Sequence, residues 1–363
     1  MLNPAAEVKT GSHHYPVQMG WGCLDEVGRL VRESGLEGRV VIVSDQAVAP
    51  LYEGAVLGAL EAAGFPVLHY EVPPGEASKT LESAGCIYDF LVEHRIERSD
   101  LVVALGGGVV GDLAGFVSAT FLRGLPWAVL PTSLVAMTDA SIGGKTGINH
   151  PRAKNLIGAF HQPVLVLADV STLSTLPTRE LTSGWAEVIK HGFTLDTELL
   201  DMLETHVEAL RSLDPEMTVR AVALSAAAKA AVVSQDERES GLRRVLNYGH
   251  TIGHALEAST DYGRFLHGEA VAIGMMGAVR LSQRLGLVSE ALVARQESLL
   301  TVFGLPTRCS GVDRAMVDKA MELDKKSQEG EVRWVLLTAT GKTTVRPVPF
   351  AEVEAVLEEL VQP

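Results

Sequence analysis

Apolar and polar positions divide the chain into two parts with different periodicities. Up to about Pro177, short apolar runs alternate with helical patterns. The runs predict strands at 39–44, 67–72, 101–105, 127–130 and 164–168, and the patterns predict helices at 51–64, 80–95 and from the glycine-rich turn after residue 105 to about 121. Short β-branched runs bounded by turn residues are typical of buried parallel strands. This alternation predicts a Rossmann-like parallel α/β domain over residues 1–177.

The pattern changes at about Thr178 and becomes mostly helical. Apolar residues at helical spacing predict helices at 178–191, 197–212, 215–233, 250–259, 268–285, 289–303 and 350–361, with one strand at 332–337. Residues 178–363 are therefore expected to form a second, mostly α-helical domain.

Four side chains in this second part have the spacing and chemistry of a metal site. His250 and His254 are four residues apart and share a helical face, and His267 opens the next helical pattern. Upstream, Glu187 offers a carboxylate and shares a face with Lys190. Imidazole and carboxylate groups are common ligands of divalent transition metals. The pattern leaves open which three of the four candidates bind.

A glycine-rich turn follows the predicted strand at 101–105. It reads GGGVVGD, from Gly106 to Asp112, and opens a helix. Glycines let backbone N–H groups approach a phosphate, and a helix N-terminus favours negative charge. The spacing is neither GxGxxG nor a P-loop, so a tight turn without a ligand is the alternative interpretation. Asp45 and Glu76, which follow other strands, could accept hydrogen bonds from ribose hydroxyls.

Cations gather near the glycine-rich and metal-candidate segments of an otherwise acidic chain. A second glycine-rich stretch, 139–149, carries Lys145 and is followed by Lys154 and Asn155. The other cations near such segments are Arg123, Lys190, Lys229, Arg243, Lys325 and Lys326. Any one of them could be an ordinary solvated side chain. Gathered around a metal, several would suit a small, multiply anionic substrate.

Composition narrows the class of protein. The 363 residues suffice for two domains, and 45 acidic against 31 basic residues leave a net charge of −14, which disfavours nucleic acid and anionic membranes as partners. No apolar run is long enough to predict a membrane span, and the N-terminus lacks the pattern of a signal peptide. Three scattered cysteines predict free thiols in a cytoplasmic protein.

Several long motifs, in order, resemble the 3-dehydroquinate synthases, a sugar phosphate cyclase family of the shikimate pathway. They include GGGVVGDLAGFVSATFLRG (106–124), MTDASIGGKTGIN (137–149), GWAEVIKHG (184–192) and DERESGLRRVLNYGHTIGHALE (236–257). The resemblance implies an NAD-binding α/β domain, a helical metal domain, an active site in the cleft between them and a homodimer. It also implies a role in chorismate and aromatic amino acid biosynthesis.

Carried over position by position, the resemblance assigns roles to individual residues. It makes Glu187, His250 and His267 the metal ligands, with Zn²⁺ the default ion and Co²⁺ a plausible substitute, and it places His254 beside the substrate. The nucleotide positions that it implies are Asp45, Gly75, Glu76, Lys79, Gly107, Gly108, Val109, Val110, Gly111, Asp112, Thr132, Ser133, Lys145, Lys154, Thr172, Leu173, Ser174 and Thr175. The substrate-side positions are Arg123, Asp139, Lys145, Lys154, Asn155, Lys190, Lys229, Arg243, Asn247, His254 and one of Lys325 and Lys326.

The implied reaction converts 3-deoxy-D-arabino-heptulosonate 7-phosphate to 3-dehydroquinate and phosphate. NAD⁺ would first accept a hydride from the substrate. Phosphate would then leave by elimination, and the hydride would be returned within the same turnover. An intramolecular aldol step would close the ring. Three alternatives stay open: a metal-dependent polyol dehydrogenase, another sugar phosphate cyclase, and a protein that binds metal and nucleotide without catalysis.

Overall fold

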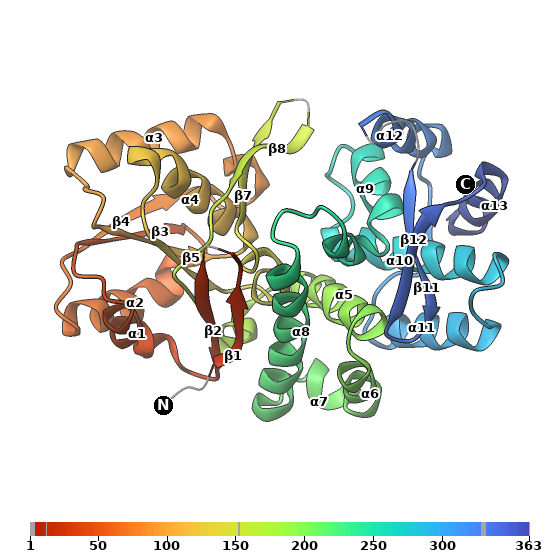
Figure 1. The fold of residues 1–363 in the computed structure, drawn as a ribbon, viewed down its shortest axis with the longest axis horizontal. Helices are drawn as coiled ribbons and strands as arrows, with labels where there is room; N and C mark the ends of the chain where they lie inside the picture. The colour runs from red at the N-terminus through yellow and green to blue at the C-terminus, as the bar shows by residue number, and fades with distance from the viewer. Residues whose placement is uncertain (1–3, 12, 152, 328–331, 363) are drawn as a thin grey trace. The chain divides into compact units, whose positions relative to one another are not determined.

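The chain folds into two compact units that do not follow a single boundary along the sequence. The computed structural model describes residues 4–11, 13–151, 153–327 and 332–362, and for residues 322–327 it describes the backbone alone. The first unit comprises Met1–Leu176 and Thr218–Arg238, and the second comprises Pro177–Met217 and Glu239–Pro363 (Figure 1).

The first unit is built on a seven-stranded sheet, in the order β1-β2-β9-β6-β5-β3-β4. β1 pairs antiparallel with β2, and every other neighbouring pair is parallel, which confirms the predicted parallel α/β class. The strands of the sheet are β1 (Pro4–Lys9), β2 (His14–Gly20), β3 (Val40–Asp45), β4 (Val67–Val72), β5 (Leu101–Gly106), β6 (Trp127–Pro131) and β9 (Leu165–Asp169). The helices are α1 (Val27–Glu33), α2 (Ala49–Ala62), α3 (Leu81–Glu93), α4 (Gly108–Thr120) and α8 (Pro215–Gln235).

Helices cover both faces of this sheet, which explains its continuous apolar strands. Every residue of β3, β5, β6 and β9 is buried. α1 and α2 pack on one face through residues such as Val31 and Leu60, and α3 and α4 lie on the other (Figure 1). A strand buried on both sides has no polar face, so its sequence reads as an apolar run instead of an alternation.

The second unit is mostly helical, as the sequence predicts. Its helices are α5 (Thr178–Thr194), α6 (Thr197–Thr205), α7 (Val207–Arg211), α9 (His250–Ser259), α10 (His267–Arg284), α11 (Glu290–Val302), α12 (Arg314–Ser327) and α13 (Phe350–Leu360). Its strands form two small sheets, β11 (Arg333–Ala339) with β12 (Lys342–Pro347), and β10 (Cys309–Ser310) with β13 (Val361–Gln362). α10 packs against α5, α9, α11 and α13 and forms the core of the unit.

Several elements were not predicted from the sequence, and the strands among them are stabilised by pairing and not by a local apolar pattern. The expected glycine-rich loop at 139–149 ends in β7 (Lys145–His150), which forms an antiparallel hairpin with β8 (Ala153–Phe160). β8 alternates between exposed and half-buried residues, so it shows no apolar face. β1, β2, β12, α1 and α12 were likewise not predicted. The helix expected at 197–212 is interrupted at His206, between α6 and α7.

α8 corrects the predicted domain division. The sequence assigned it to the second domain, but Thr218–Arg238 belongs to the first unit. Lys229 Nζ donates to the carbonyl oxygen of Asp139 at 2.6 Å, and Gln162 Nε2 donates to Glu237 at 2.9 Å. α8 is also long and apolar enough to cross a membrane, contrary to expectation. However, half of its most apolar window is buried inside the protein, as in the core helix of a soluble enzyme.

Candidate metal and nucleotide sites

Apart from Lys145 and Lys154, which lie on the β7–β8 hairpin, the predicted nucleotide-binding residues lie at or after the carboxyl ends of parallel strands in the first unit. Asp45 ends β3, and Thr132 and Ser133 come directly after β6. The remaining segments are Gly75 to Lys79 after β4, Gly107 to Asp112 after β5, and Thr172 to Thr175 after β9. Parallel strands end at the same edge of a sheet, so the fold gathers these segments along one edge. They are up to 130 residues apart in sequence, from 45 to 175.

The strand order marks one position on this edge. From β3 the chain moves outward to β4, and then returns to place β5 and β6 on the other side of β3. In open α/β sheets, ligands bind at the carboxyl edge where the strand order reverses in this way. Asp45 and the glycine loop lie at the ends of the two strands that flank this switch point.

Two glycines of the glycine loop differ in how closely they are packed. A Cβ at Gly106 would lie 2.8 Å from the side chain of Val110, so packing excludes a side chain there. At Gly107 the nearest atom would be Ser133 Oγ at 3.5 Å, which is ordinary contact. Internal packing therefore does not account for Gly107, whereas the close approach of a phosphate to the N-terminus of α4 would.

Lys79 joins two segments that the sequence treated separately. Its buried ammonium contacts the carboxylate of Asp112 and the side-chain oxygen of Asn155. Asn149, which was assigned no role, donates to Glu76 at 2.7 Å and accepts from the backbone N–H of Asn155 at 3.0 Å. The β7–β8 hairpin is thus tied to the nucleotide loop after β4. Asn149 could have been found because it ends the GKTGIN motif.

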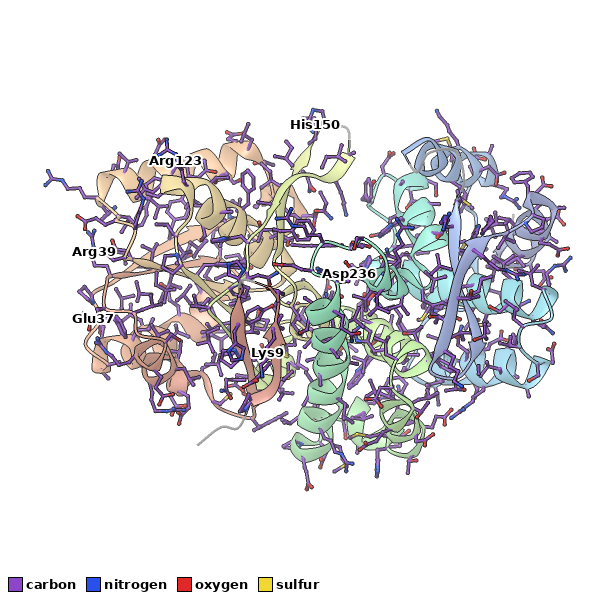
Figure 2. The ribbon with its side chains drawn as sticks, in the orientation of Figure 1. Lys9, Glu37, Arg39, Arg123, His150 and Asp236 are labelled. Atoms are coloured by element: carbon purple, nitrogen blue, oxygen red, sulfur yellow. The ribbon has the colours of Figure 1, made fainter. Side chains whose placement is uncertain are left out.

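The predicted cations of the first unit do not gather at one point. Lys145 begins β7, whereas Lys154 lies near the start of β8, at the other end of the hairpin. At about 3.4 Å per residue, the four positions from 145 to 149 separate them by roughly 14 Å. Arg123 follows α4 at the end away from the glycine loop, about 20 Å along the helix. Figure 2 shows Arg123 well separated from His150 at the hairpin tip.

Asp139 and Lys229 form a pair within the first unit. The Lys229 ammonium contacts both the carboxylate and the backbone carbonyl of Asp139. Lys229 is 5% exposed. These two residues, predicted from separate motifs, therefore form one ion pair.

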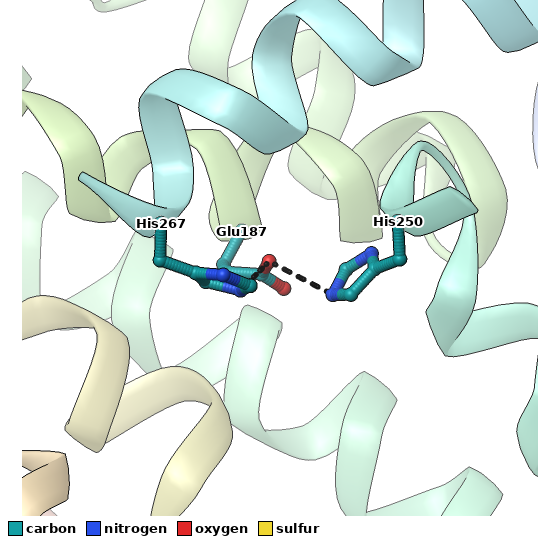
Figure 3. A group of neighbouring side chains, drawn as sticks. All are labelled: Glu187, His250 and His267. Carbon is teal, nitrogen blue, oxygen red and sulfur yellow. Dashed lines mark ion pairs between the residues drawn. The ribbon is translucent and has the colours of Figure 1, made fainter. Parts of the chain in front are cut away.

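Three side chains of the second unit converge as a metal site would require. Glu187 comes from the middle of α5, and His250 and His267 are the first residues of α9 and α10. Glu187 Oε1 lies 3.6 Å from His250 Nε2 and 3.5 Å from His267 Nε2 (Figure 3). Ligands held tetrahedrally at about 2.1 Å from Zn²⁺ are roughly 3.4 Å apart. The two measured distances are close to that value, and all three ligand atoms lie within 4.8 Å of one another.

Glycines let the three helices approach closely enough to bring these ligands together. A Cβ at Gly268, next to His267, would lie 1.8 Å from the carbonyl oxygen of Ser183, one turn before Glu187. A Cβ at Gly274 would lie 1.9 Å from the carbonyl oxygen of Gly249, next to His250. The backbone of α10 therefore touches those of α5 and α9 directly beside the ligands.

The buried carboxylate of Glu187 favours positively charged groups beside it. Glu187 is fully buried, and among the described residues neither of its oxygens has a hydrogen bond of ordinary geometry. Burial alone would raise the pKa of Glu187, but Lys190, which forms an ion pair with it, and the two histidines hold it well below its usual value. Burial and the Lys190 ammonium hold the pKa of His250 well below its usual value, which keeps this imidazole neutral, as a ligand must be.

His267 has a different environment from His250. Burial opposes a charge on this ring, but the carboxylates of Glu187 and Glu257 outweigh burial and raise its pKa to about 10. The two carboxylates therefore favour a positive charge at this ring, which a proton supplies when no metal ion is bound. His254, on the exposed side of α9, groups with Glu257 and His267 as a second possible ligand set.

Of the remaining predicted residues of the second unit, Arg243 and Asn247 lie close to His250 in sequence. Arg243 is 2% exposed, and Asn247 donates to Glu239 at 2.7 Å. Glu239 was missed by sequence reasoning, and its only signal was its place in the DERESGLRRVLNYGH motif. Lys325 and Lys326 belong to α12, but their side chains lie outside the described residues.

Comparison with known proteins identifies the family of the chain. The family model for the N-terminal part of 3-dehydroquinate synthase matches residues 69–183, and that for its C-terminal part matches residues 184–327. The chain is 48% identical over 329 residues to the 3-dehydroquinate synthase of Citrifermentans bemidjiense, covering 91% of each chain. It is 47% identical over 355 residues to that of Halorhodospira halophila, covering 98% of each.

A solved structure carries both kinds of ligand on a similar fold. The 2-epi-5-epi-valiolone synthase ValA of Streptomyces hygroscopicus subsp. jinggangensis, with NAD⁺ and Zn²⁺ bound, is 28% identical with a TM-score of 0.87, over 95% of this chain and 96% of that one. The identity to the 3-dehydroquinate synthases is much higher and extends over more than nine-tenths of both chains. The chain therefore belongs to the 3-dehydroquinate synthase family.

Proposed function

We infer that this chain acts as a 3-dehydroquinate synthase on 3-deoxy-D-arabino-heptulosonate 7-phosphate, binds NAD⁺ at the carboxyl edge of its sheet and holds one divalent metal ion with Glu187, His250 and His267. The observation that carries the proposal is the convergence of these three side chains, in a chain that matches the family along its length. Zn²⁺ fits a set of one carboxylate and two imidazoles. This set leaves a fourth position for substrate.

The cofactors would supply chemistry that side chains lack. NAD⁺ accepts and returns a hydride, and the metal ion favours loss of a proton from a substrate hydroxyl by its positive charge. The family's structural relatives support both: ValA was solved with NAD⁺ and Zn²⁺, and a 2-deoxy-scyllo-inosose synthase, 25% identical with a TM-score of 0.85, was solved with NAD⁺ and Co²⁺.

The protein's own residues would bind and position the substrate. The chain has a net charge of −14, so an acidic sugar phosphate needs locally held cations. Lys190 and Arg243 are nearly fully buried, and charge-assisted hydrogen bonds are stronger where water is excluded. Asp139 and Lys229, paired in the first unit, would hold or move a proton near a substrate hydroxyl.

The test is turnover with two simultaneous readouts. The zinc-loaded enzyme is mixed with the heptulosonate phosphate and NAD⁺, and phosphate release and NADH absorbance are followed together. Phosphate should accumulate while NADH absorbance stays flat, because hydride is returned in each cycle. Stoichiometric NADH would instead indicate a polyol dehydrogenase. No reaction with this substrate, but turnover of another sugar phosphate, would indicate a different cyclase.

Two further statements stay predictions. The family resemblance implies a homodimer, which light scattering of the purified protein would measure. It also implies a cytoplasmic enzyme. All three cysteines, Cys23, Cys86 and Cys309, are free thiols, which is compatible with a reducing compartment.

A further inference from the structure

The two imidazoles of the metal cluster are held at their other nitrogen by different partners. His250 Nδ1 lies 3.1 Å from the backbone carbonyl oxygen of Tyr248, whose buried ring is anchored by Gln296 at 2.8 Å. His267 Nδ1 lies 3.4 Å from Glu257 Oε2. A histidine that binds a metal usually donates its second N–H to a carbonyl or carboxylate, which fixes the tautomer and the ring orientation.

We propose that Glu257 is a positioning residue of the metal site: its carboxylate accepts the Nδ1–H of His267 and holds Nε2 of that ring toward Glu187. The proposal rests on the metal set Glu187, His250 and His267 given above. It assigns Glu257 no contact with the metal.

The position of Glu257 suits this role. Glu257 lies seven residues after His250 on α9, two helical turns away and on the same side of the helix. α9 thus provides one ligand and orients the other, which α10 carries. The close backbone contact between Gly249 and Gly274 fixes the distance between these two helices. Glu257 is 7% exposed, so water screens its charge little.

The geometry of the ring separates this role from that of a ligand. Glu257 also belongs to the alternative ligand set with His254 and His267. However, the two nitrogens of one imidazole point to different sides, and Nε2 faces Glu187 while Nδ1 faces Glu257. A metal bound at Nε2 beside Glu187 therefore leaves Glu257 on the far side of the ring.

The experiment measures zinc affinity without substrate, by competition with a chromophoric chelator. Glu257→Ala should bind Zn²⁺ roughly 10- to 100-fold more weakly than wild type. Glu257→Gln keeps an acceptor oxygen of similar reach and should lose less, which also covers the case in which the alanine variant does not fold. The visible spectrum of the Co²⁺-loaded variants should shift, because the orientation of one ligand changes.

A matched control separates ring orientation from helix stability. Glu269 lies on the first turn of α10, the helix that carries His267. It accepts a hydrogen bond from the backbone N–H of Leu266 at 2.9 Å and forms an ion pair with Arg179. Glu269→Gln removes the same charge from the start of α10, so it should lower the melting temperature but leave zinc affinity within about twofold. An equal loss of zinc in Glu269→Gln and Glu257→Gln would overturn the proposal, as would wild-type affinity in Glu257→Ala.

Other outcomes distinguish this inference from the proposed function. If His254→Ala lost as much zinc as Glu257→Ala, Glu257 would be a ligand of the alternative set, and the positioning role would be wrong. If wild type bound zinc and the Glu257 variants bound it more weakly, but no enzyme released phosphate, the inference would stand and the proposed function would fail. A wild-type protein that bound no zinc would overturn both.

Discussion

His250 and His254 are one helical turn apart, yet only His250 reaches Glu187. His254 Nδ1 or Nε2 instead lies near Glu257 and His267, and its ring makes a perpendicular contact with that of His250, with ring centroids 5.2 Å apart. Two histidines four residues apart share a face, but a ligand must also point at the same spot as its partners from other helices. The position of a third residue therefore decides which of them binds.

We predict that His267→Ala loses both metal and activity, whereas His254→Ala keeps most of its metal and loses activity. His267 is one of the three converging side chains, while His254 matches a substrate-side position. Metal analysis of the two purified variants, with turnover measured on the same samples, checks this. Equal metal loss in both would restore the ligand set formed by the HxxxH pair.

Lys190 offers a second prediction at this scale, because its ammonium lies against Glu187, which we propose as a metal ligand. Replacing it in Lys190→Met keeps most of the buried volume and removes the cation beside Glu187. Zinc should bind as tightly as in wild type or more tightly, since a competing positive charge is gone. Turnover should fall by the equivalent of about 2–5 kcal/mol, as when one member of a buried charge pair is truncated.

Zinc affinity is expected to be kept or raised while turnover falls, which excludes simple misfolding as the cause. A misfolded variant would lose zinc as well as turnover. Zinc affinity and kcat/KM are measured on one preparation, and NAD⁺ affinity serves as the control, expected to be unchanged. Wild-type turnover would show that Lys190 does not act on the substrate.

At the scale of elements, glycine placement determines how closely helices pack. In α10, Gly268 lies against Ser183 of α5, and Gly274 lies against Gly249, the residue before α9. These contacts leave no room for a Cβ, so the helix interior keeps glycine despite its low helix propensity. The entropic cost of glycine is offset by the position it gives to His250 and His267.

We predict that a glycine-to-alanine substitution has opposite effects on the free energy of unfolding in two helices, α10 and α2. Gly274→Ala should destabilise the protein by about 1–3 kcal/mol or more, because its Cβ would overlap the Gly249 carbonyl oxygen. Gly58→Ala in α2, where a Cβ would meet nothing within 4 Å, should stabilise it by about 0.5–1 kcal/mol.

Denaturant unfolding of both variants, with zinc affinity for Gly274→Ala, checks this prediction. The zinc affinity of Gly274→Ala should fall as α9 and α10 move apart, while that of Gly58→Ala should not change. If Gly274→Ala were as stable as wild type, the helices would have more freedom than the structure indicates.

At the scale of the whole chain, α8 returns to the first unit after three helices of the second, α5, α6 and α7. Lys229, on this helix, contacts the carboxylate and the carbonyl of Asp139, which lies 90 residues earlier in the sequence. The pair therefore links an insertion-like segment to the sheet domain, and it also matches two substrate-side positions.

We predict that Lys229 and Asp139 stabilise the first unit through their mutual contact, so that their contributions to stability are coupled. Lys229→Met should destabilise the protein by about 1–3 kcal/mol, because it leaves the Asp139 carboxylate, 28% exposed, without that cation. The double variant Lys229→Met/Asp139→Asn should be more stable than the sum of the two single changes, with a coupling of about 0.5–3 kcal/mol. Thermal and denaturant unfolding of the four proteins gives this cycle.

Activity distinguishes the two roles of the pair. Stability should recover in the double variant while turnover stays lost, because both residues are also expected to act on the substrate. Additive destabilisation would show that the contact contributes no coupling, and recovery of turnover would show that the pair is structural alone.

The sequence by itself determined the class of each part, the glycine loop and the four metal candidates, because these depend on local periodicity and local spacing. Buried parallel strands read as apolar runs, and helix faces repeat every three to four residues, whatever lies elsewhere in the chain. The assignment of residues to roles came from the long motifs.

Only the tertiary structure decided which candidates converge, that α8 belongs with the first unit, and that the glycine-rich stretch before Asn149 is half of a hairpin tied to Glu76. Each depends on contacts between residues about 60 or more apart in sequence, such as Glu187 with His250. Local patterns carry no information on such distances, because the closeness of two helices is set by backbone contacts at glycines like Gly268 and Gly274. The positions of Glu187, His250 and His267 relative to one another therefore depend on how their helices pack, which is determined by residues far apart in the chain.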